Sequence, residues 1–403
     1  MSPGMFRSAA ILGLLSCVGP FAIDMYLPAM PLIEQDLATD VSHVQATITA
    51  FFVAFGVSQL VYGPWADQAG RKPPLYTGLT LFAVATVACA LAPTIGWLTA
   101  ARFVQGLGAA VVMVIPRAII RDMHTGSEAT RLMALIMLVI SVSPMLAPLL
   151  GSVLILLAGW RVIFVALGIA TILSLLMTVF LQPETLAPEH RVRVNTRSLL
   201  KGCRTLVTDP VFMGLTFIGG FGMASFFVFI ASASFVYTGQ FGLTPVEFSL
   251  AFAVNAIGFF GASQFAAHLG EKFGAIAVMR AAIFGFFLFN ALLVSLVLSG
   301  LGTLIVLIAL LFCGNACLGL VIPTTMVMAL DPHGEIAGLA SSLGGTLQML
   351  SGGLVITATS PFFDATATPM VIAIFVCSVA ALLLTLALQN RVKDTAINFL
   401  SEP

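Results

Sequence analysis

The sequence predicts an all-α integral membrane protein with twelve transmembrane helices in two six-helix halves. The first observation is composition: 59% of the 403 residues are hydrophobic and 8% are charged, against about 25% charged in a typical soluble domain. The second is that apolar tracts of about 20 residues, long enough to cross about 30 Å of hydrocarbon as helices, recur along the whole chain. The third is one long polar stretch near the middle, which separates six tracts from six.

The apolar tracts have the length of helices and lack the alternating pattern of about ten residues that marks a barrel strand. A helix also satisfies its own backbone hydrogen bonds, which lipid cannot do. The run before Cys17 resembles a lipoprotein signal, but it continues to Met30, so we count it as the first helix. The predicted helices lie at about 8–30, 43–65, 74–93, 97–120, 132–157, 160–182, 211–236, 246–268, 276–299, 303–329, 337–359 and 369–389.

Lysine and arginine residues predict the orientation, because the cytoplasmic loops of a membrane protein carry most of them. With the N-terminus in the cytoplasm, the outer side receives only Arg161, and Arg102 lies within the fourth tract. Both termini are therefore predicted to be cytoplasmic, and the formal net charge of zero hides this asymmetry. The cytoplasmic side then holds Arg7, Arg71, Lys72, Arg117, Arg121, Arg131, Arg191, Arg193, Arg197, Lys201, Arg204, Lys272, Arg280, Arg391 and Lys393.

The two halves share a short repeat. The sequence FGVSQ at Phe55–Gln59 in the second tract returns as FGASQ at Phe260–Gln264 in the eighth. Asp67 follows the first copy at nearly the distance at which Glu271 follows the second. Two such units around a site at the membrane midplane are typical of transporters. The predicted organisation is an N-terminal half at 1–182, a cytoplasmic linker at 183–210, a C-terminal half at 211–390 and a cytoplasmic tail at 391–403.

The loop between the second and third tracts carries the motif GPWADQAGRKPPL, Gly63–Leu75. Gly63 and Gly70 permit a tight turn, Asp67 supplies an anion and Arg71 a cation at the membrane surface. On spacing alone, the loop could be no more than a basic segment that sets the orientation. Its pattern closely resembles the signature loop of the major facilitator superfamily.

That resemblance implies a conformational latch. In the superfamily, the acid of this loop is thought to meet a helix N-terminus of the other half and a basic residue at the inner end of helix four. Carried over, Asp67 would face the start of helix eleven near Ile336, where the positive end of a helix favours a carboxylate. Arg117 or Arg121 would be the basic partner.

Helix four contains Arg102, at a depth where a charge costs at least about 2.5 kcal/mol unless it finds a partner, a cavity or water. Gln105 and Gly106 follow it, and this Arg, Gln, Gly pattern resembles a helix-four motif of the same superfamily that is tied to proton-coupled members. In helix five, Ala147–Ser152 resembles the antiporter motif of drug exporters, although two glycines of that motif are replaced here. Taken alone, the prolines of this segment equally predict a kinked structural helix.

The branch of the superfamily is indicated by three further segments. Asp24–Pro31 at the outer end of helix one, Arg121–Asp122 after helix four and Gly159–Arg161 opening helix six resemble the Bcr/CflA drug:proton antiporters, which export bicyclomycin and chloramphenicol. The resemblance covers the first half and the twelve-helix plan, and is thin in the second half.

Asp24 is the only acid that we place well inside a tract. On a helical wheel it shares a stripe with Gly13, Cys17 and Pro20, which predicts that it points into the bundle. It lies about 7.5 Å outside the centre of helix one, and Arg102 lies about 9 to 10 Å from the centre of helix four on the same side. Asp24 and Arg102 are therefore either a proton-coupling pair, with Asp24 as the proton carrier, or a buried ion pair or helix cap that specifies packing.

The drug site is predicted in a cavity between the halves near the midplane. Aromatic walls with few hydrogen-bonding groups suit amphiphilic molecules in pockets of about 300 to 1,000 Å³. Each phenylalanine of helix seven could equally be a packing or lipid-facing residue. The candidate substrate-binding residues are Tyr26, Phe226, Phe227, Asn255, Asn315 and Gln348.

The resemblance implies a proton-coupled antiporter that exports small amphiphilic drugs or antibiotics by alternating access. It would act as a monomer in the bacterial inner membrane, with a drug, a proton and the bilayer as partners. Two alternatives stay open: a transporter of a native metabolite such as an amino acid or sugar derivative, and a membrane receptor on a transporter scaffold. No enzyme, cofactor, metal or nucleic-acid function is expected, because the sequence offers no catalytic trio, no metal-ligand set and no Walker phosphate loop.

Overall fold

The computed structural model describes residues 3–124, 126–191 and 196–388. This part of the chain is built from helices, with no β-strand. The predicted tail at 391–403 lies outside the described residues, as do Arg193, Arg391 and Lys393. Part of the predicted linker, residues 192–195, is outside them as well.

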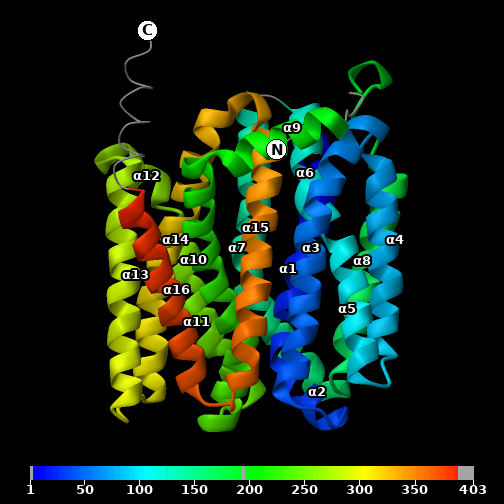
Figure 1. Cartoon of the computed structure of the whole chain (residues 1–403). Coiled ribbons are helices and arrows are strands. Elements are labelled where there is room, and N and C mark those ends of the chain that lie inside the picture. Colours follow the sequence, from blue (N-terminus) through cyan, green and yellow to red (C-terminus); the bar gives the residue numbers. More distant parts are fainter. Residues whose placement is uncertain (1–2, 125, 192–195, 389–403) are drawn as a thin grey trace. The chain divides into compact units, whose positions relative to one another are not determined.

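The first part of the chain forms eight α-helices and a short 3-10 turn, η1 (Figure 1). The predicted tracts at 8–30 and 97–120 are each divided in two in the structure, and Thr94 caps the helix that carries Arg102 by accepting a hydrogen bond from Trp97 N. The helices are α1 (Pro3–Asp24), η1 (Leu27–Ala29), α2 (Met30–Asp36), α3 (Val41–Ala69), α4 (Lys72–Ala90), α5 (Ile95–Ala109), α6 (Val111–Met123), α7 (Gly126–Ala158) and α8 (Arg161–Phe180).

The second part of the chain continues in the same way. A π-helical turn, η3, extends α10, and a 3-10 turn, η4, joins α14 to α15. The elements are η2 (Pro188–His190), α9 (Thr196–Thr208), α10 (Pro210–Phe235), η3 (Val236–Gln240), α11 (Pro245–Ser263), α12 (Ala266–Phe273), α13 (Ala275–Leu298), α14 (Leu304–Leu330), η4 (Asp331–Ile336), α15 (Ala337–Thr359), η5 (Ser360–Phe362) and α16 (Ala367–Ala387).

The twelve-helix prediction is confirmed. Within the described residues, 11 helical segments are long and apolar enough to cross a membrane. One of them, Leu304–Phe362, has 59 residues, far more than the roughly 20 that one crossing needs. It contains both α14 and α15, which meet at His333, where the backbone is not helical (φ −118°, ψ 33°). This segment therefore supplies two of the twelve predicted helices.

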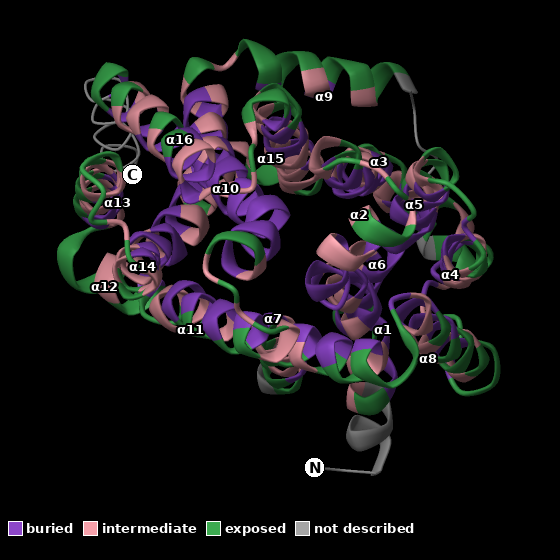
Figure 2. Ribbon diagram, turned by 90° about the horizontal axis from the view of Figure 1, so that it is seen from below, coloured by how far each residue is buried: buried purple, intermediate pink, exposed green. Residues whose placement is uncertain are grey.

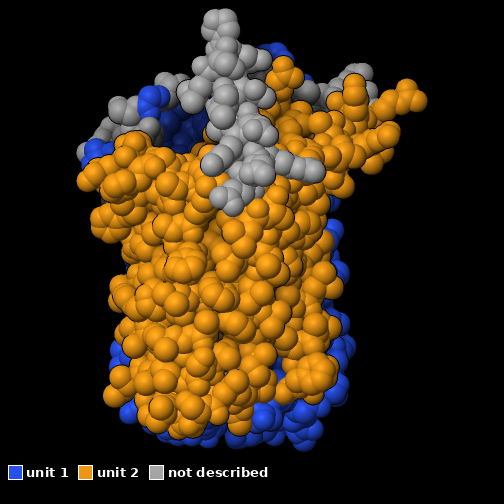
Figure 3. Space-filling view, turned by 60° about the vertical axis from the view of Figure 1, so that its left-hand side comes forward, with its two compact units in different colours: residues 1–195, 231–253, 363–365 blue, residues 196–230, 254–362, 366–403 orange. Residues whose placement is uncertain are grey.

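The chain divides into two compact units, coloured separately in Figure 3. Unit 1 comprises residues 1–195, 231–253 and 363–365, and unit 2 comprises residues 196–230, 254–362 and 366–403. The first boundary falls inside the predicted linker. Unit 1 also includes the C-terminal end of α10 and the N-terminal part of α11. The predicted split into halves at 1–182 and 211–390 stays a prediction.

In unit 1, α5 packs closely against both α3 and α4, and α4 packs against α8 (Figure 1). Glycines of α5 make this approach possible. A Cβ on Gly106 would strike the backbone carbonyl of Phe51 in α3. One on Gly108 would lie 2.5 Å from the carbonyl oxygen of Gly78 and 2.6 Å from Phe82 N in α4. At both places a backbone occupies the space of a side chain, so only glycine fits without a shift.

In unit 2, α13 packs against α14 and α16. Phe259 of α11, Phe286 of α13 and Leu318 of α14 form an apolar core there. Gly319 of α14 lets that helix touch α11, because a Cβ would strike the carbonyl of Phe259. The same device of glycine against backbone thus holds helices together in each unit.

Outward-facing positions along the helices are apolar, as expected of a surface that lies in lipid. Figure 2 shows exposed residues along α8, and a soluble protein rarely exposes a contiguous apolar patch of this kind. The exposed apolar side chains of this helix are Val165, Ile169, Ile172, Leu173, Leu176, Val179 and Phe180.

We predict that Gly106→Ala destabilises the protein by about 1–3 kcal/mol, because the new methyl group overlaps a backbone carbonyl that cannot rotate away. The measurement is the thermal unfolding midpoint of the purified protein in detergent. Gly96→Ala is the matched control, since a Cβ there meets nothing within 4 Å. Equal midpoints for the two variants would show that α3 and α5 are not held at this distance.

Candidate functional site

The side chain of Arg102 is completely enclosed within unit 1. It has 0% of its surface exposed. Its guanidinium lies over two aromatic rings, 4.6 Å from the ring centroid of Tyr26 and 4.4 Å from that of Phe51. Nη1 donates to the carbonyl oxygen of Ala22 at 3.1 Å, in the last turn of α1. A cation is favoured both by ring faces and by the unpaired carbonyls at the end of a helix.

A chain of hydrogen bonds supports this guanidinium. Nη1 of Arg102 also donates to Gln105 Oε1, one turn further along α5. Gln105 Nε2 donates to Thr86 Oγ1 at 2.7 Å, and Thr86 donates to the carbonyl of Phe82 at 2.7 Å. Nε and Nη2 of Arg102 have no hydrogen-bond partner within the described residues. A buried cation thus retains two unused donor groups.

Asp24 is the last residue of α1, and it is buried, with 4% exposed. No hydrogen bond or ion pair joins its carboxyl to Arg102 or to any other side chain in the part of the chain that the structure describes. The stripe of α1 predicted to face the bundle, Gly13, Cys17 and Pro20, is half-buried. The opposite stripe, Ile11, Leu15, Val18 and Ala22, is buried. The reason is that α1 packs against α6, α7 and α8, which enclose more than one of its sides.

Tyr26 is fully buried beside the guanidinium. Its hydroxyl is hydrogen-bonded to Thr47 Oγ1 at 2.7 Å, and Thr47 donates to the carbonyl of Val44. Its ring lies 6.0 Å from that of Phe164. Tyr26 therefore holds Arg102 in place, and its predicted role in substrate binding stays a prediction.

The Gly63–Leu75 loop forms a charge cluster with two distant acids, Asp122 and Glu184. Arg71 pairs with Asp67 through Nη1 at 2.6 Å. It also donates to both carboxylate oxygens of Asp122, from Nε to Oδ2 at 2.7 Å and from Nη2 to Oδ1 at 3.2 Å. This contact is bidentate, and bidentate arginine–carboxylate pairs are among the strong hydrogen-bonded contacts in proteins. We call these four residues the loop charge cluster.

Glu184 binds the backbone of the same loop. Its carboxylate accepts hydrogen bonds from the N–H groups of Arg71 at 2.9 Å and Lys72 at 3.1 Å. Gly70 has a φ of +99°, and a Cβ there would lie 2.6 Å from Glu184 Oε2, so the motif needs glycine at this turn. Partial burial raises the pKa of Glu184, but the four backbone N–H groups that it accepts outweigh burial and hold that pKa below its ordinary value.

The other latch candidates, Arg117 and Arg121, make no ion pair with Asp67 within the described residues. Arg121 is exposed. Nε of Arg117 is buried without a hydrogen-bond partner. The basic partner of Asp67 in this structure is Arg71. Gly63 lies within α3, so the tight turn is made by Gly70 alone.

At the other end of unit 1, Gly159–Arg161 and Asp36 form a second charged contact. Arg161 Nη1 donates to Asp36 Oδ2 at 2.6 Å, and Trp160 Nε1 donates to the same oxygen at 3.0 Å. Arg161 Nη2 reaches the carbonyl of Ala92 at 3.1 Å, and its guanidinium lies over the Trp160 ring. Trp160 and Arg161 therefore connect the α7–α8 turn both to α2, through Asp36, and to the α4–α5 turn, through Ala92.

Neutral groups make two further long-range contacts within unit 1. Ser152 replaces a glycine of the antiporter pattern. Its hydroxyl donates to the carbonyl of Pro245 at 2.8 Å and lies 2.8 Å from Ser249 Oγ in α11. Gln45 Nε2 donates to Ser232 Oγ at 3.2 Å and to the Ala231 carbonyl at 3.3 Å. The glycine replacement thus gives α7 a polar contact with α11.

Unit 2 holds the other substrate-binding candidates. Phe226 is buried and stacks on Phe259, with 4.9 Å between ring centroids. Phe227 is buried against Gly352 of α15. Asn315 donates to Asn255 Oδ1 at 3.4 Å, and both are buried. The structure therefore brings Asn255 and Asn315 together and uses both phenylalanines in packing.

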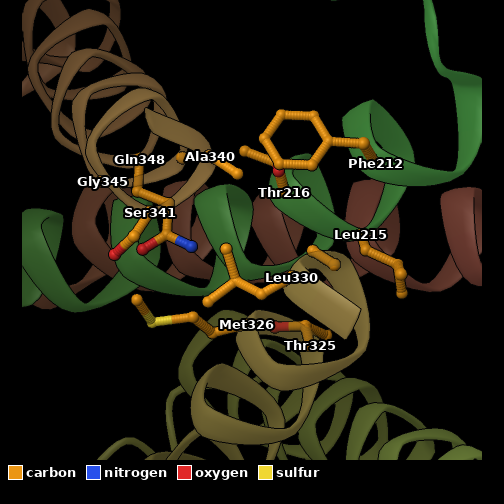
Figure 4. A pocket seen from close by; sticks show the side chains of 12 residues that line it. Phe212, Leu215, Thr216, Thr325, Met326, Leu330, Ala340, Ser341, Gly345 and Gln348 are labelled. Atoms are coloured by element: carbon orange, nitrogen blue, oxygen red, sulfur yellow. The ribbon is translucent and has the colours of Figure 1, made fainter. Parts of the chain in front are cut away.

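Gln348 lines a small, mainly apolar pocket between α10, α14 and α15 of unit 2 (Figure 4). The pocket has a volume of about 30 Å³, enough for water. Thr216, Thr325 and Ser341 bring hydroxyl groups to its wall. A Cβ on Gly219 would lie 2.9 Å from Gln348 Nε2 and 3.0 Å from Thr325 Oγ1, so the absence of a side chain there leaves room for both groups.

The family is decided by comparison with known proteins. The sequence model of the Major Facilitator Superfamily matches residues 12–356, most of the chain. This chain belongs to the major facilitator superfamily. Superfamily members are transporters and not enzymes, and the relatives and apolar helices indicate a multi-pass protein of the bacterial inner membrane.

Relatives within the superfamily are similar along nearly their whole length. The chain is 35% identical to the uncharacterized MFS-type transporter YdgK of Bacillus subtilis over 92% of each protein. It is 29% identical to a bicyclomycin resistance protein homolog of Haemophilus influenzae, over 94% of this chain and 95% of the relative. It is 30% identical to a chloramphenicol resistance protein of Pseudomonas aeruginosa, over 93% and 88%. The expected Bcr/CflA resemblance is confirmed.

Solved structures support the same fold. The nucleoside transporter NupG aligns with a TM-score of 0.76 at 13% identity, over 96% of this chain and 99% of that one. A D-xylose-proton symporter aligns with a TM-score of 0.71 at 15% identity, over 94% and 97%. At these identities the likeness concerns the major facilitator fold alone.

Several residues of these sites were not singled out from the sequence. Glu184 lies in a polar linker in which nothing distinguishes it from the neighbouring Glu189. Thr86 and Thr47 look like ordinary small residues of apolar helices. In the structure, Thr86 bonds to Gln105 and Thr47 bonds to Tyr26, and both of these partners contact Arg102. These contacts, and so the supporting role of the threonines, become visible only in the folded chain.

We predict that Arg102→Lys lowers the thermal unfolding midpoint of this superfamily member. Lysine keeps the charge but loses the planar group that lies over Tyr26 and Phe51 and donates to Ala22 and Gln105, at a cost of about 1–3 kcal/mol. Arg204→Lys is the control at an exposed arginine. A midpoint unchanged in both variants would mean that the rings and carbonyl do not hold the guanidinium.

The depressed pKa of Glu184 predicts a pH dependence. A carboxylate whose pKa is lower in the folded state stabilises the fold above its unfolded-state pKa, about 4.3, and this stabilisation is lost as pH falls through the folded value. We expect Glu184→Gln to have a lower midpoint than the natural protein at pH 7 and to lose less on going below pH ~4. Glu189→Gln, at an exposed position, should keep the natural profile, and parallel curves for all three proteins would contradict the prediction.

Proposed function

We propose that this transporter exports small amphiphilic drugs in exchange for protons by alternating access, with Asp24 as the proton carrier. The single observation that carries the proposal is the pairing state of Asp24. It is an acid, buried within a membrane helix bundle and without a side-chain partner among the described residues. An isolated ionised carboxylate is costly to bury, so such a site accommodates the protonated acid best.

Arg102 supports this role indirectly. Its guanidinium contacts Ala22, Gln105 and two rings, and among the described residues it forms no ion pair with Asp24. A carboxyl that must lose its proton in one state and regain it in another cannot be locked in a strong pair. Arg102 instead orders the end of α1, two residues before the acid, and keeps a positive charge in the same unit.

The substrate class rests on the relatives. Three of them carry the names bicyclomycin resistance protein homolog, chloramphenicol resistance protein and multidrug resistance protein D. Drug export by this chain is further favoured by the pocket beside Gln348, where Phe212, Leu215 and Met326 supply apolar surface. Tyr26, Phe226, Phe227, Asn255, Asn315 and Gln348 remain the candidate substrate-binding residues.

The loop charge cluster fits the proposed latch. Asp67 is more than half exposed on its side chain, whereas the Arg71 side chain is 8% exposed and is held by Asp122. Asp67 thus keeps surface available for a further partner, while Arg71 and Glu184 fix the shape of the loop. We propose that Asp67 is the part of the loop that engages and releases during transport.

The experiment is drug addition to inverted membrane vesicles with an imposed pH gradient, comparing the natural protein with Asp24→Asn over a panel of antibiotics. Drug should release protons through the natural protein, and the variant should release at least about tenfold less, since an amide cannot carry a proton. Asp331→Asn, at an exposed acid outside the helices' apolar stretches, should behave as the natural protein does. Equal release by both Asp24 forms would remove Asp24 from the mechanism, and uptake driven by another solute would reject antiport.

A further inference from the structure

We infer that unit 1 carries a second binding site, for a hydrophobic organic cation, in a pocket beside α2. The pocket has a volume of about 300 Å³, which lies at the lower end of the range for small-molecule sites. Its wall is contributed by η1 and α2, by the end of α10 with the π-helical turn, and by the segment before α11. It shares no residue with the guanidinium site, although Pro28 of its wall follows Tyr26 by two positions.

The charge of the pocket indicates the sign of the ligand. Glu34 lines it, and among the described residues that do so none is Lys, Arg or His. The neighbouring acids are already used: Asp36 binds Arg161, and Asp40 caps α3 and binds His43. Glu34 is partly buried, and no hydrogen bond or ion pair to its carboxylate occurs within the described ranges. Glu34 thus places a carboxylate without a partner among the described residues at the wall of the cavity.

The rest of the wall indicates the kind of cation. Pro28, Leu32, Phe235 and Leu243 present apolar surface. A metal ion would need several oxygen ligands, and the pocket offers a single carboxylate. An organic cation with aryl or alkyl substituents, such as a quaternary ammonium or phosphonium, matches one carboxylate within apolar walls. Gln35 and Thr238 also line the pocket, but Thr238 Oγ1 already donates to the Ser234 carbonyl at 2.7 Å. Glu34 is the one charged residue of the described lining.

The pocket is built on fixed elements. Phe235 packs edge-on against Phe363, with 6.3 Å between centroids. Leu243 N donates to the Tyr237 carbonyl at 3.0 Å, which closes the turn after η3. On the opposite wall, Asp36 is held by Trp160 and Arg161, two residues after Glu34. Both walls are therefore held in place by contacts that do not involve Glu34 itself.

The test uses the full chain in detergent with its six native cysteines replaced by alanine and Gln35→Cys placed at the exposed rim of the pocket. The rate of maleimide labelling of that cysteine is measured against tetraphenylphosphonium concentration. We expect the cation to protect the cysteine, Glu34→Gln to weaken protection at least tenfold, and Glu271→Gln, at an exposed acid elsewhere, to leave it unchanged. The neutral analogue triphenylphosphine oxide should protect weakly in both.

Two further variants separate this site from the proposed transport site. Asp24→Asn should keep full protection, so failure of the proton-exchange proposal would not affect the result. Gly239→Leu places a branched side chain at the lining, where a Cβ meets nothing closer than 3.9 Å, and should abolish protection without unfolding the protein. Protection that survives both Glu34→Gln and Gly239→Leu, or that is lost in Asp24→Asn alone, would overturn the inference.

Discussion

The burial of one guanidinium constrains much of unit 1. Arginine stays charged under all ordinary conditions, so Arg102 cannot enter the bundle without partners that surround it. Its neighbours come from four helical segments: the end of α1, the turn that holds Tyr26, α3 through Phe51, and α4 through Thr86. Each must reach the right depth for the charge to be accommodated. The close glycine contacts of α5 are what let α3 and α4 come near enough to do so.

The same requirement explains why Asp24 stands apart. The acceptors that Arg102 uses are a carbonyl, an amide and two ring faces, none of which can lose or gain a proton in the cell's range. The fold thus supports a fixed positive charge with groups that do not titrate, while Asp24 has no side-chain partner among the described residues. For the proposed proton exchange, such an acid can change its charge more readily than one in a closed ion pair.

Sequence patterns predicted the helices well, because apolar tracts of membrane length have few alternative structures in lipid. They predicted the burial of Asp24 but not which side of α1 is enclosed, since nearly all of that helix is apolar and its buried stripe, Ile11, Leu15, Val18 and Ala22, has no distinguishing chemistry. The partners of Arg71 could not be read from the motif, because Asp122 and Glu184 lie 51 and 113 residues away along the chain. Contacts between distant loops depend on how the helices pack, which the loop sequence does not encode.

The bonds at the two ends of α3 differ in strength, and this has a consequence for motion. Near Arg71 the contacts are charged, and the bidentate one to Asp122 is worth about 1.5–3 kcal/mol, whereas the single one to the exposed Asp67 is worth less because solvent screens it. Near Gln45, and at the Ser152–Ser249 contact, they are neutral amide and hydroxyl bonds worth about 0.5–1.5 kcal/mol. Neutral bonds exchange with water more readily than a bidentate ion pair does, so within unit 1 the Gln45–Ser232 and Ser152–Ser249 contacts separate at a lower cost in free energy than the Arg71–Asp122 contact.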